Sequence, residues 1–366
     1  MTSIVDSIQK TFWSTYVEFP FLFTGIIVIG GIVIFIVMAV NALIAVYFER
    51  KVSAFMQDRL GPMEVGILGF KGGKNFWGGI GQTLADAIKL LVKEDILPKD
   101  ADKILMILSP FIIFTAALLT FIGVPFSQNF VISDFNIGLF YIVAMSSIGV
   151  IGIILAGWSS NNKWSLYGSM RAAAQIISYE IPIGLSLLLV VLVTGSLHLG
   201  DIVQWQENHR WFILHSPFTF MAFFIYFISV VAETNRTPFD IPEAESELVA
   251  GWMTEYSGFR WALFFLSEYA NILIVCIVAS IVFLGGWLSP LHLFNIFPAS
   301  WDLLDGPVMG FFWIFFKAIM LIFVMMWFRW TFPRLRVDQL MYLCWKVFIP
   351  FALANLFLVS LWELII

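Results

Sequence analysis

The sequence predicts an all-α, polytopic integral membrane protein. Hydrophobic residues make up 60% of the 366 residues and charged residues only 12%, whereas soluble domains contain roughly 45–50% and about 25%. Apolar stretches of about 20 residues, the length of helix that spans a hydrocarbon core of about 30 Å, recur along the whole chain. We therefore expect residues 1–366 to form one transmembrane domain.

Eight apolar stretches are expected to form transmembrane helices. The first corresponds to about 42 Å of helix at about 1.5 Å per residue, which exceeds the thickness of the core. It is therefore expected to be strongly tilted or to protrude. The eight stretches are residues 21–48, 104–126, 136–158, 172–195, 216–233, 262–288, 307–328 and 341–364.

Basic residues predict the orientation, because Lys and Arg are enriched in cytoplasmic loops. They concentrate in the loop at residues 49–103 and in alternate later loops, which include residues 234–261. The opposite side contains only Lys10 and Arg210 outside the apolar stretches. We therefore assign the two long loops to the cytoplasm and both termini to the outer side.

The first long loop contains a predicted amphipathic helix. Residues 82–92 place apolar side chains at helical spacing on one face, opposite Asp86 and Lys89. This pattern is typical of a helix that lies in the membrane interface. A helix packed against a partner protein would show the same pattern, and both interpretations stay open.

Composition excludes several kinds of site. Cys276 and Cys344 both lie inside apolar stretches, so no cysteine cluster is available to hold zinc or an iron–sulfur centre. The four histidines have no spacing that would bring two ligands onto one helix face, and we expect no metal site. The basic residues are dispersed along a chain of net charge −5, which gives no indication of nucleic-acid binding.

Four charged residues are expected at membrane depth. Glu180, Glu233, Glu268 and Lys317 fall within or at the ends of apolar stretches. Burying such a group in lipid costs a few kcal/mol and needs a functional or pairing reason. A structural ion pair is the alternative, but it usually adds little net stability because both charges are desolvated.

The densest acidic region follows the fifth apolar stretch. Residues 233–255 contain six acids, and no lysine lies between Arg236 and Arg260. A capping box at Asp240 and Glu243 would account for two of the six. Like charges at i and i+4, as at Glu243 and Glu247, destabilise a helix. Because close carboxylates in a partly dry site cannot all stay ionised, the pattern favours a proton path or a cation site.

Six arginines are expected on the same side as this acidic region. Near two of them, residues 47–51 and 55–62 alternate charged and apolar side chains. Such alternation suits an amphipathic cavity for a lipid-soluble ligand with a polar head. The six are Arg50, Arg59, Arg236, Arg329, Arg334 and Arg336.

Nine ordered motifs, spread over nearly the whole chain, resemble those of the respiratory complex I subunit 1 family, whose bacterial members are the H subunits of NADH-quinone oxidoreductase. The motifs are Glu49-Arg-Lys, Arg59-Leu-Gly-Pro, Ala85-Asp-Ala-Ile-Lys-Leu, Gly157-Trp, Arg171-Ala-Ala-Ala-Gln-Ile-Ile-Ser-Tyr-Glu180, Ala232-Glu-Thr-Asn-Arg-Thr-Pro-Phe-Asp, Glu245-Ser-Glu-Leu-Val, Phe264-Phe-Leu-Ser-Glu-Tyr269 and Pro333-Arg-Leu-Arg-Val-Asp-Gln-Leu.

The resemblance implies eight transmembrane helices in a bacterial cell membrane and a tunnel for ubiquinone or menaquinone shared with peripheral subunits. Iron–sulfur centres of those partners would deliver the electrons, so this chain would need no catalytic residue for electron transfer and no metal or flavin of its own. The other implied partners are small membrane subunits, antiporter-like subunits and lipid.

The resemblance also implies roles for individual residues. The proton path would contain Glu180, Glu233, Glu255 and Glu268. A flexible loop that couples this path to the tunnel would contain Asp240, Glu243, Glu245 and Glu247. The quinone tunnel would be lined or braced by Glu49, Arg50, Arg59, Arg236 and Phe239.

One segment departs from the family pattern, since residues 70–79 resemble an insertion rich in Gly and Lys. This departure concerns the mouth of the tunnel. Two other functions are alternatives. The membrane subunit of an energy-converting hydrogenase would be accompanied by a nickel-binding partner. A stand-alone cation transporter would commonly show repeated halves and paired broken helices, and neither is evident here.

Overall fold

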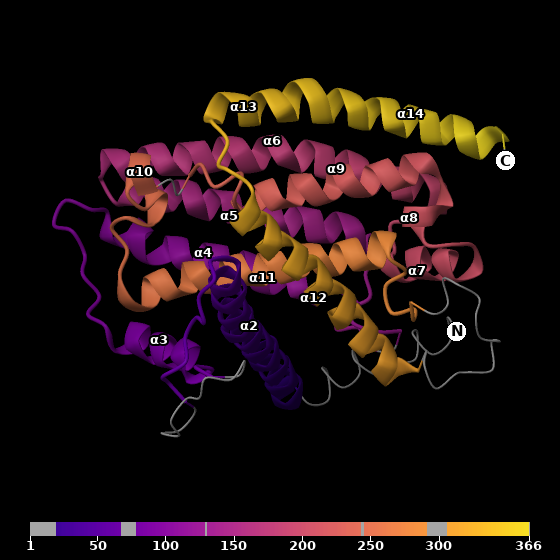
Figure 1. Ribbon diagram of the computed structural model, residues 1–366. Helices are drawn as coiled ribbons and strands as arrows, with labels where there is room; N and C mark the ends of the chain where they lie inside the picture. The colour runs from indigo at the N-terminus through magenta and orange to yellow at the C-terminus, as the bar shows by residue number, and fades with distance from the viewer. Residues whose placement is uncertain (1–19, 67–77, 129, 243–244, 291–305, 366) are drawn as a thin grey trace.

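The chain is described by a computed structural model over residues 20–66, 78–128, 130–242, 245–290 and 306–365 (Figure 1). The regular elements in these ranges are helices, accompanied by one isolated β-bridge between Pro125 and Val131. Seven helices in the described ranges are long and apolar enough to cross a membrane. The predicted all-α, polytopic membrane fold is confirmed.

Most of the spanning helices extend beyond the apolar stretches that predict them. The C-terminal span runs from α13 through a π-helical segment, Leu343–Phe348, into α14. The helices are α2 (Pro20–Met56), α4 (Lys103–Ile122), α5 (Gly138–Ser159), α6 (Lys163–Thr194), α11 (Gly258–Phe283), α12 (Pro307–Thr331), α13 (Val337–Tyr342) and α14 (Ile349–Ile365).

The eighth expected span, residues 216–233, forms the shorter helix α9 (Pro217–Glu233). Its 17 residues correspond to about 25 Å at about 1.5 Å per residue, which is less than the hydrocarbon thickness of about 30 Å. A count of eight transmembrane helices therefore stays a prediction.

Local sequence signals set several helix ends. Asp102 caps α4 by accepting hydrogen bonds from the backbone N–H groups of Ile104 and Leu105. Asn162 caps α6 in the same way, and α6 ends at Gly195, whose φ of +71° is favourable for glycine. Such caps satisfy backbone groups that a helix end leaves without partners.

Small residues allow close packing of α4, α5 and α6. A Cβ added at Gly152 of α5 would lie 2.4 Å from Ile113 of α4. One added at Gly157 would lie 2.0 Å from the Ser169 hydroxyl of α6. Spanning helices associate through such close contacts, because lipid supplies no hydrophobic drive between them.

The short helices mark two ends of the bundle. Helices α3 (Gly81–Val92) and α10 (Glu245–Leu248) lie at one end, while α7 (Leu199–Asn208), α8 (Phe212–His215) and the end of α14 lie at the other (Figure 1). Helix α2 is inclined to the nearly parallel α6 and α14, as expected for the long first span. The long loops therefore meet at the α3 and α10 end.

The predicted amphipathic helix is α3. Its apolar side chains Leu84, Ile88 and Leu91 are exposed, while Asp86 on another face pairs with Arg50 of α2 at 2.6 Å. Burial alone would raise the pKa of Asp86, but the hydrogen bond and charge of Arg50 outweigh it and hold this pKa below its usual value. The exposed stripe is compatible with both the interfacial and the partner-bound interpretation.

Candidate functional site

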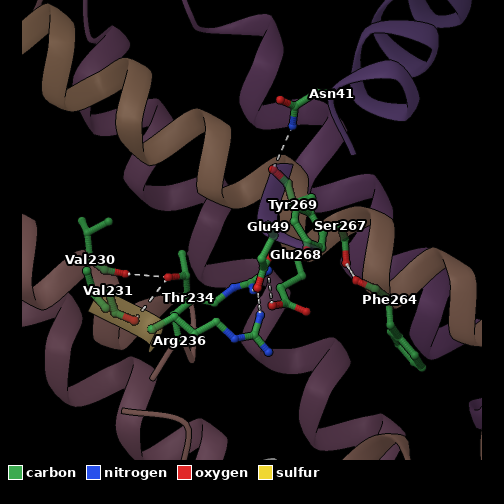
Figure 2. Close-up of polar contacts among 11 residues, drawn as sticks. Asn41, Glu49, Val230, Val231, Thr234, Arg236, Phe264, Ser267, Glu268 and Tyr269 are labelled. Atoms are coloured by element: carbon green, nitrogen blue, oxygen red, sulfur yellow. Dashed lines mark hydrogen bonds and ion pairs between the residues drawn. The ribbon is translucent and has the colours of Figure 1, made fainter. Parts of the chain in front are cut away.

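A buried group of charged side chains joins α2, α11, α12 and the loop after α9. Arg236 donates through Nη1 to Glu49 Oε1 at 2.9 Å and pairs through Nη2 with Glu268 Oε1 at 2.9 Å (Figure 2). Arg329 forms a second ion pair with Glu49. The Tyr269 hydroxyl donates to Glu49 Oε2 at 2.5 Å. With two carboxylates and two guanidinium groups, this charge cluster is formally neutral.

The chain turn after α9 positions Arg236. Asn235 has a φ of +51°, a conformation that Asn tolerates better than most residues, and the Arg236 backbone N–H returns to Val231 O at 3.2 Å. Burial alone would lower the pKa of Arg236, but Glu268 and Glu49 raise it well above its usual value. Arg236 is therefore a permanent buried cation.

The charge cluster borders a small cavity that is lined by both charged and apolar residues. One part of the wall is charged and comes from Glu49, Arg236 and Arg329, whereas the rest is apolar and includes Ile272 and Met325. Its volume of about 10 Å³ is enough for roughly one water molecule. Arg236 Nε is buried without a hydrogen-bond partner among the described residues, so a polar donor is available at this cluster.

The loop that carries Arg236 is docked on α6. Gln175 of α6 donates to Ala232 O and Phe239 O, both at 2.8 Å, and to Asn235 Oδ1 at 3.1 Å. Phe239 is buried, and its ring lies 5.8 Å from that of Tyr179. A single amide side chain thus fixes both ends of the loop turn.

The same loop contacts the segment between α12 and α13. Arg334 pairs with Asp240 Oδ2 at 2.9 Å, and the Leu335 N–H donates to Pro238 O at 3.0 Å. The other oxygen, Oδ1, is buried without a hydrogen-bond partner among the described residues. Burial raises the pKa of Asp240, and the charge of Arg334 offsets this only in part.

A second acidic pair lies deeper in the bundle. Glu180 of α6 is within electrostatic range of Glu233 at the end of α9, and Ser147 of α5 lies beside Glu180 while its hydroxyl donates to Val143 O at 3.0 Å. The Oε1 atom of Glu180 is buried without a hydrogen-bond partner in the described part of the chain. Tyr226 lies within the same electrostatic range of Glu233. Two half-buried acids, one on α6 and one at the end of α9, therefore lie close enough to influence each other's charge.

The sequence matches one known family over most of its length. A family described as NADH dehydrogenase matches residues 29–360. The chain belongs to the NADH dehydrogenase family.

Relatives carry a more specific name. The chain is 50% identical over 343 residues to the H subunit of NADH-quinone oxidoreductase from Chlorobaculum tepidum, and the match covers 92% of each chain. It is 45% identical over 358 residues to the protein of the same name from Bacteroides thetaiotaomicron, covering 97% of this chain and 93% of the relative. The resemblance indicated by the motifs is confirmed.

The charge cluster brings together three of the residues assigned to the tunnel and the proton path. Glu49, Arg236 and Glu268 meet there, and Phe239 lies on the same loop as Arg236. Arg50 instead pairs with Asp86 on α3. Arg59 is exposed and bonds to Gln57. The expected tunnel residues thus occupy three neighbouring places at one end of the bundle.

The remaining predicted acids are more dispersed. Glu255 accepts a hydrogen bond of 2.6 Å from Asn162 at the start of α6. Glu247 is exposed and pairs with Arg171 of α6 at 2.6 Å. Glu245 belongs to α10, but its side chain lies outside the described set, as does the whole of Glu243 and most of the 70–79 segment. The roles assigned to these residues stay predictions.

Two residues of the charge cluster have no role in the tunnel or the proton path that the sequence predicts. Tyr269 follows Glu268 directly in one of the family motifs, and Arg329 was recognised only as one of six arginines on the same side. Another buried cation, Lys51, donates to the carbonyls of Leu60 and Pro62 and holds the following loop against α2. No local pattern predicts these contacts, because their partners come from distant or irregular segments.

Lys317 has a structural explanation. Its ammonium donates to the carbonyls of Leu284, Gly286 and Leu288, at 2.7, 2.8 and 2.7 Å, and lies 4.3 Å from the centre of the Trp211 ring. These carbonyls belong to the irregular segment that follows the end of α11, so they have no helical donors of their own and accept from Lys317 instead. The buried charge of Lys317 thus holds α12 against the segment that follows α11.

Proposed function

We propose that this chain is the membrane subunit of a proton-translocating NADH–quinone oxidoreductase, in which it borders the quinone site and carries protons away from it. Family membership and the names of the relatives support the reaction class. The observation that carries the proposal for this chain is the buried, neutral charge cluster beside an apolar wall. A quinone, with a polar head on an apolar ring and tail, matches that combination.

The small cavity volume indicates that this chain supplies only part of the quinone site. About 10 Å³ admits no quinone ring, so the cluster forms one wall and peripheral partner subunits complete the tunnel. Those partners also hold the iron–sulfur centres that deliver electrons. The quinone is then a substrate, and the residues of this chain position its head and manage its protons.

Charge compensation explains the use of two arginines. Reducing a quinone to a quinol takes two electrons and two protons, and negative charge develops on the quinone oxygen before protonation. Arg236 and Arg329 would stabilise that charge. Because both already pair with Glu49, a new anion competes with Glu49 for its cations. A buried carboxylate that loses its cation takes up a proton.

The docked loop provides the route from this event to the deeper acids. Gln175 fixes the loop to α6, and Glu180 lies five positions further along the same helix. A change in the Arg236 pairing would therefore shift α6 or the loop and alter the surroundings of Glu180 and Glu233. We propose that this electrostatic change moves protons along Glu268, Glu233 and Glu180, with Asp240, Glu243, Glu245, Glu247 and Glu255 at the loop side.

The reaction class is tested by purification. A tag on this chain, gentle detergent extraction and identification of the accompanying polypeptides should yield flavin-bearing and iron–sulfur subunits, together with inhibitor-sensitive reduction of quinone by NADH. A nickel-binding partner would instead indicate a hydrogenase. A lone chain that exchanges cations in liposomes would indicate a transporter. The outer-side location of both termini is tested by protease protection in oriented membrane vesicles.

The proton path is tested in reconstituted vesicles. Glu180→Gln should lower the number of protons moved per NADH oxidised, because the amide keeps the size of the side chain and removes its proton exchange. Glu207→Gln is the matched control, since Glu207 is exposed on α7 at the opposite end from the charge cluster. A Glu180→Gln enzyme that pumps with normal stoichiometry would contradict the proposed path.

A further inference from the structure

A second, larger hollow opens on the outside of the bundle between α6 and α13. Its volume is about 250 Å³. Figure 1 shows α13 beside α6 at the end that carries α10. The residues that matter for its chemistry are Tyr167, Met170, Arg171 and Ala174 of α6 and Leu340 and Met341 of α13. We call this hollow the α6–α13 groove.

The walls of the groove have the character of a membrane interface. Tyr167 and Met170 are each 59% exposed, and Trp164, one turn earlier on α6, is 43% exposed. Tyr and Trp are enriched where spanning helices leave the hydrocarbon and enter the headgroup region. The apolar floor therefore lies at the depth where acyl chains begin.

Positive charge stands at the rim of this apolar floor. The Arg171 side chain lines the groove and is 34% exposed. Arg336 is exposed and directly precedes Val337, another lining residue. Basic pockets between spanning helices on the cytoplasmic side bind the headgroups of anionic lipids. The groove thus combines an apolar channel with a cationic entrance.

We propose that the α6–α13 groove binds an anionic phospholipid, with the phosphate beside Arg171 and one acyl chain over Met170, Ala174 and Leu340. Inorganic phosphate would leave the apolar floor uncovered, so the lipid is the better match. Arg171 now pairs through Nη1 with Glu247, whose side chain is 58% exposed. Exposed pairs of this kind contribute little, so the lipid phosphate competes with Glu247 for the same guanidinium group.

Photolabelling in lipid nanodiscs tests this site directly. The full chain, with the subunits that accompany it, is placed in phosphatidylcholine containing a small share of phosphatidylglycerol with a photoreactive acyl chain. A parallel sample contains photoreactive phosphatidylcholine. Peptide mapping should locate the phosphatidylglycerol adducts in residues 167–174 and 337–341, several-fold above those of phosphatidylcholine.

Four variants separate charge from shape. Arg171→Gln should lower labelling by phosphatidylglycerol about fivefold, the effect of one basic group at a lipid surface. Glu247→Gln should raise it by removing the competitor. Ala174→Phe fills the groove without altering charge and should abolish labelling there. Lys103→Gln, which removes an exposed cation at the start of α4, should change nothing.

Three results would overturn the lipid site. The first is equal labelling by the anionic and the zwitterionic lipid, which would remove the role of Arg171. The second is full labelling of the Ala174→Phe protein, which would place the lipid outside the groove. The third is adducts on an accompanying polypeptide with none on the groove peptides, which would show that a protein partner occupies this surface.

Discussion

Arg236 and Lys317 are both buried cations in the same bundle, with 5% and 6% of their surfaces exposed, but their partners differ in kind. Lys317 donates to three main-chain carbonyls, which cannot change their charge. Arg236 faces Glu49 and Glu268, which can each take up a proton. Main-chain carbonyls do not titrate, whereas a carboxylate can exist in a charged and a protonated form.

The kind of partner distinguishes a structural buried cation from a functional one more clearly than the degree of burial does. Any charge placed in a low-dielectric interior needs compensation, so burial alone marks both residues equally. When the partners are fixed dipoles, as the carbonyls around Lys317 are, the charge holds α11 and α12 together. Compensation by groups that titrate gives a site whose pairing can respond to a neighbouring charge. Variants of each set should therefore fail in different ways.

The largest effect is expected from Glu49→Gln. The amide removes the charge that Arg236 and Arg329 share, and breaking a buried ion pair in this way typically costs about 3–5 kcal/mol. Quinone reduction should fall on the order of 100-fold, the usual effect of losing a preorganised electrostatic group. Turnover is measured per assembled enzyme, with flavin content as the measure of assembly.

A matched control distinguishes this effect from the loss of any one carboxylate at the same end of the bundle. Glu94→Gln removes an exposed carboxylate in the segment after α3 and should leave turnover unchanged. If Glu49→Gln lowers only the amount of assembled enzyme, and the assembled fraction turns over normally, the charge cluster has a structural role like that of Lys317.

Lys317→Met is expected to have an effect of intermediate size, and this effect is on stability and not on turnover. Methionine keeps the length of the side chain but leaves the carbonyls after α11 without this donor, and each buried unsatisfied acceptor costs about 1–3 kcal/mol. The thermal midpoint and the yield should fall. Turnover per assembled enzyme should stay near normal, since the charge cluster is intact. Lys103→Met serves as the control, and a selective loss of turnover would contradict the structural assignment.

Much of the fold followed from segment lengths. The apolar stretches predicted α4, α5, α6, α11 and α12, because a helix is the only open-ended structure that satisfies its backbone within lipid. The end of α2 was missed. This helix continues through Glu49, Arg50 and Lys51 to Met56, since each of these charged residues finds a partner in the folded chain.

The site could be predicted only as a set of residue types. Glu49 contacts Arg236, Tyr269 and Arg329, which lie 187, 220 and 280 positions away in sequence. Local spacing carries no information about such contacts, and the family motifs marked their members without pairing them. For the same reason, the sequence does not distinguish a structural from a functional role for Lys317, whose carbonyl partners lie 29 to 33 positions away.

The smallest effect is expected for the pH dependence of loop docking, which we attribute to Asp240. Burial raises the pKa of this carboxyl above its usual value. At a pH between the usual and the raised pKa, Asp240 is protonated when the loop is docked and ionised when the loop is open. Docking is therefore strongest below the usual pKa and weakens as pH rises through the raised one.

Hydrogen exchange of residues 236–241, corrected for the intrinsic pH dependence of exchange, should show this loss of protection. Asp240→Asn should remove the pH dependence, because the amide mimics the protonated carboxyl at every pH. Asp338→Asn, an exposed change in α13, should preserve it. An unchanged slope in the Asp240→Asn protein would assign the titration to the Glu49 and Glu268 carboxylates, and the loop would then respond to the charge cluster and not to its own acid.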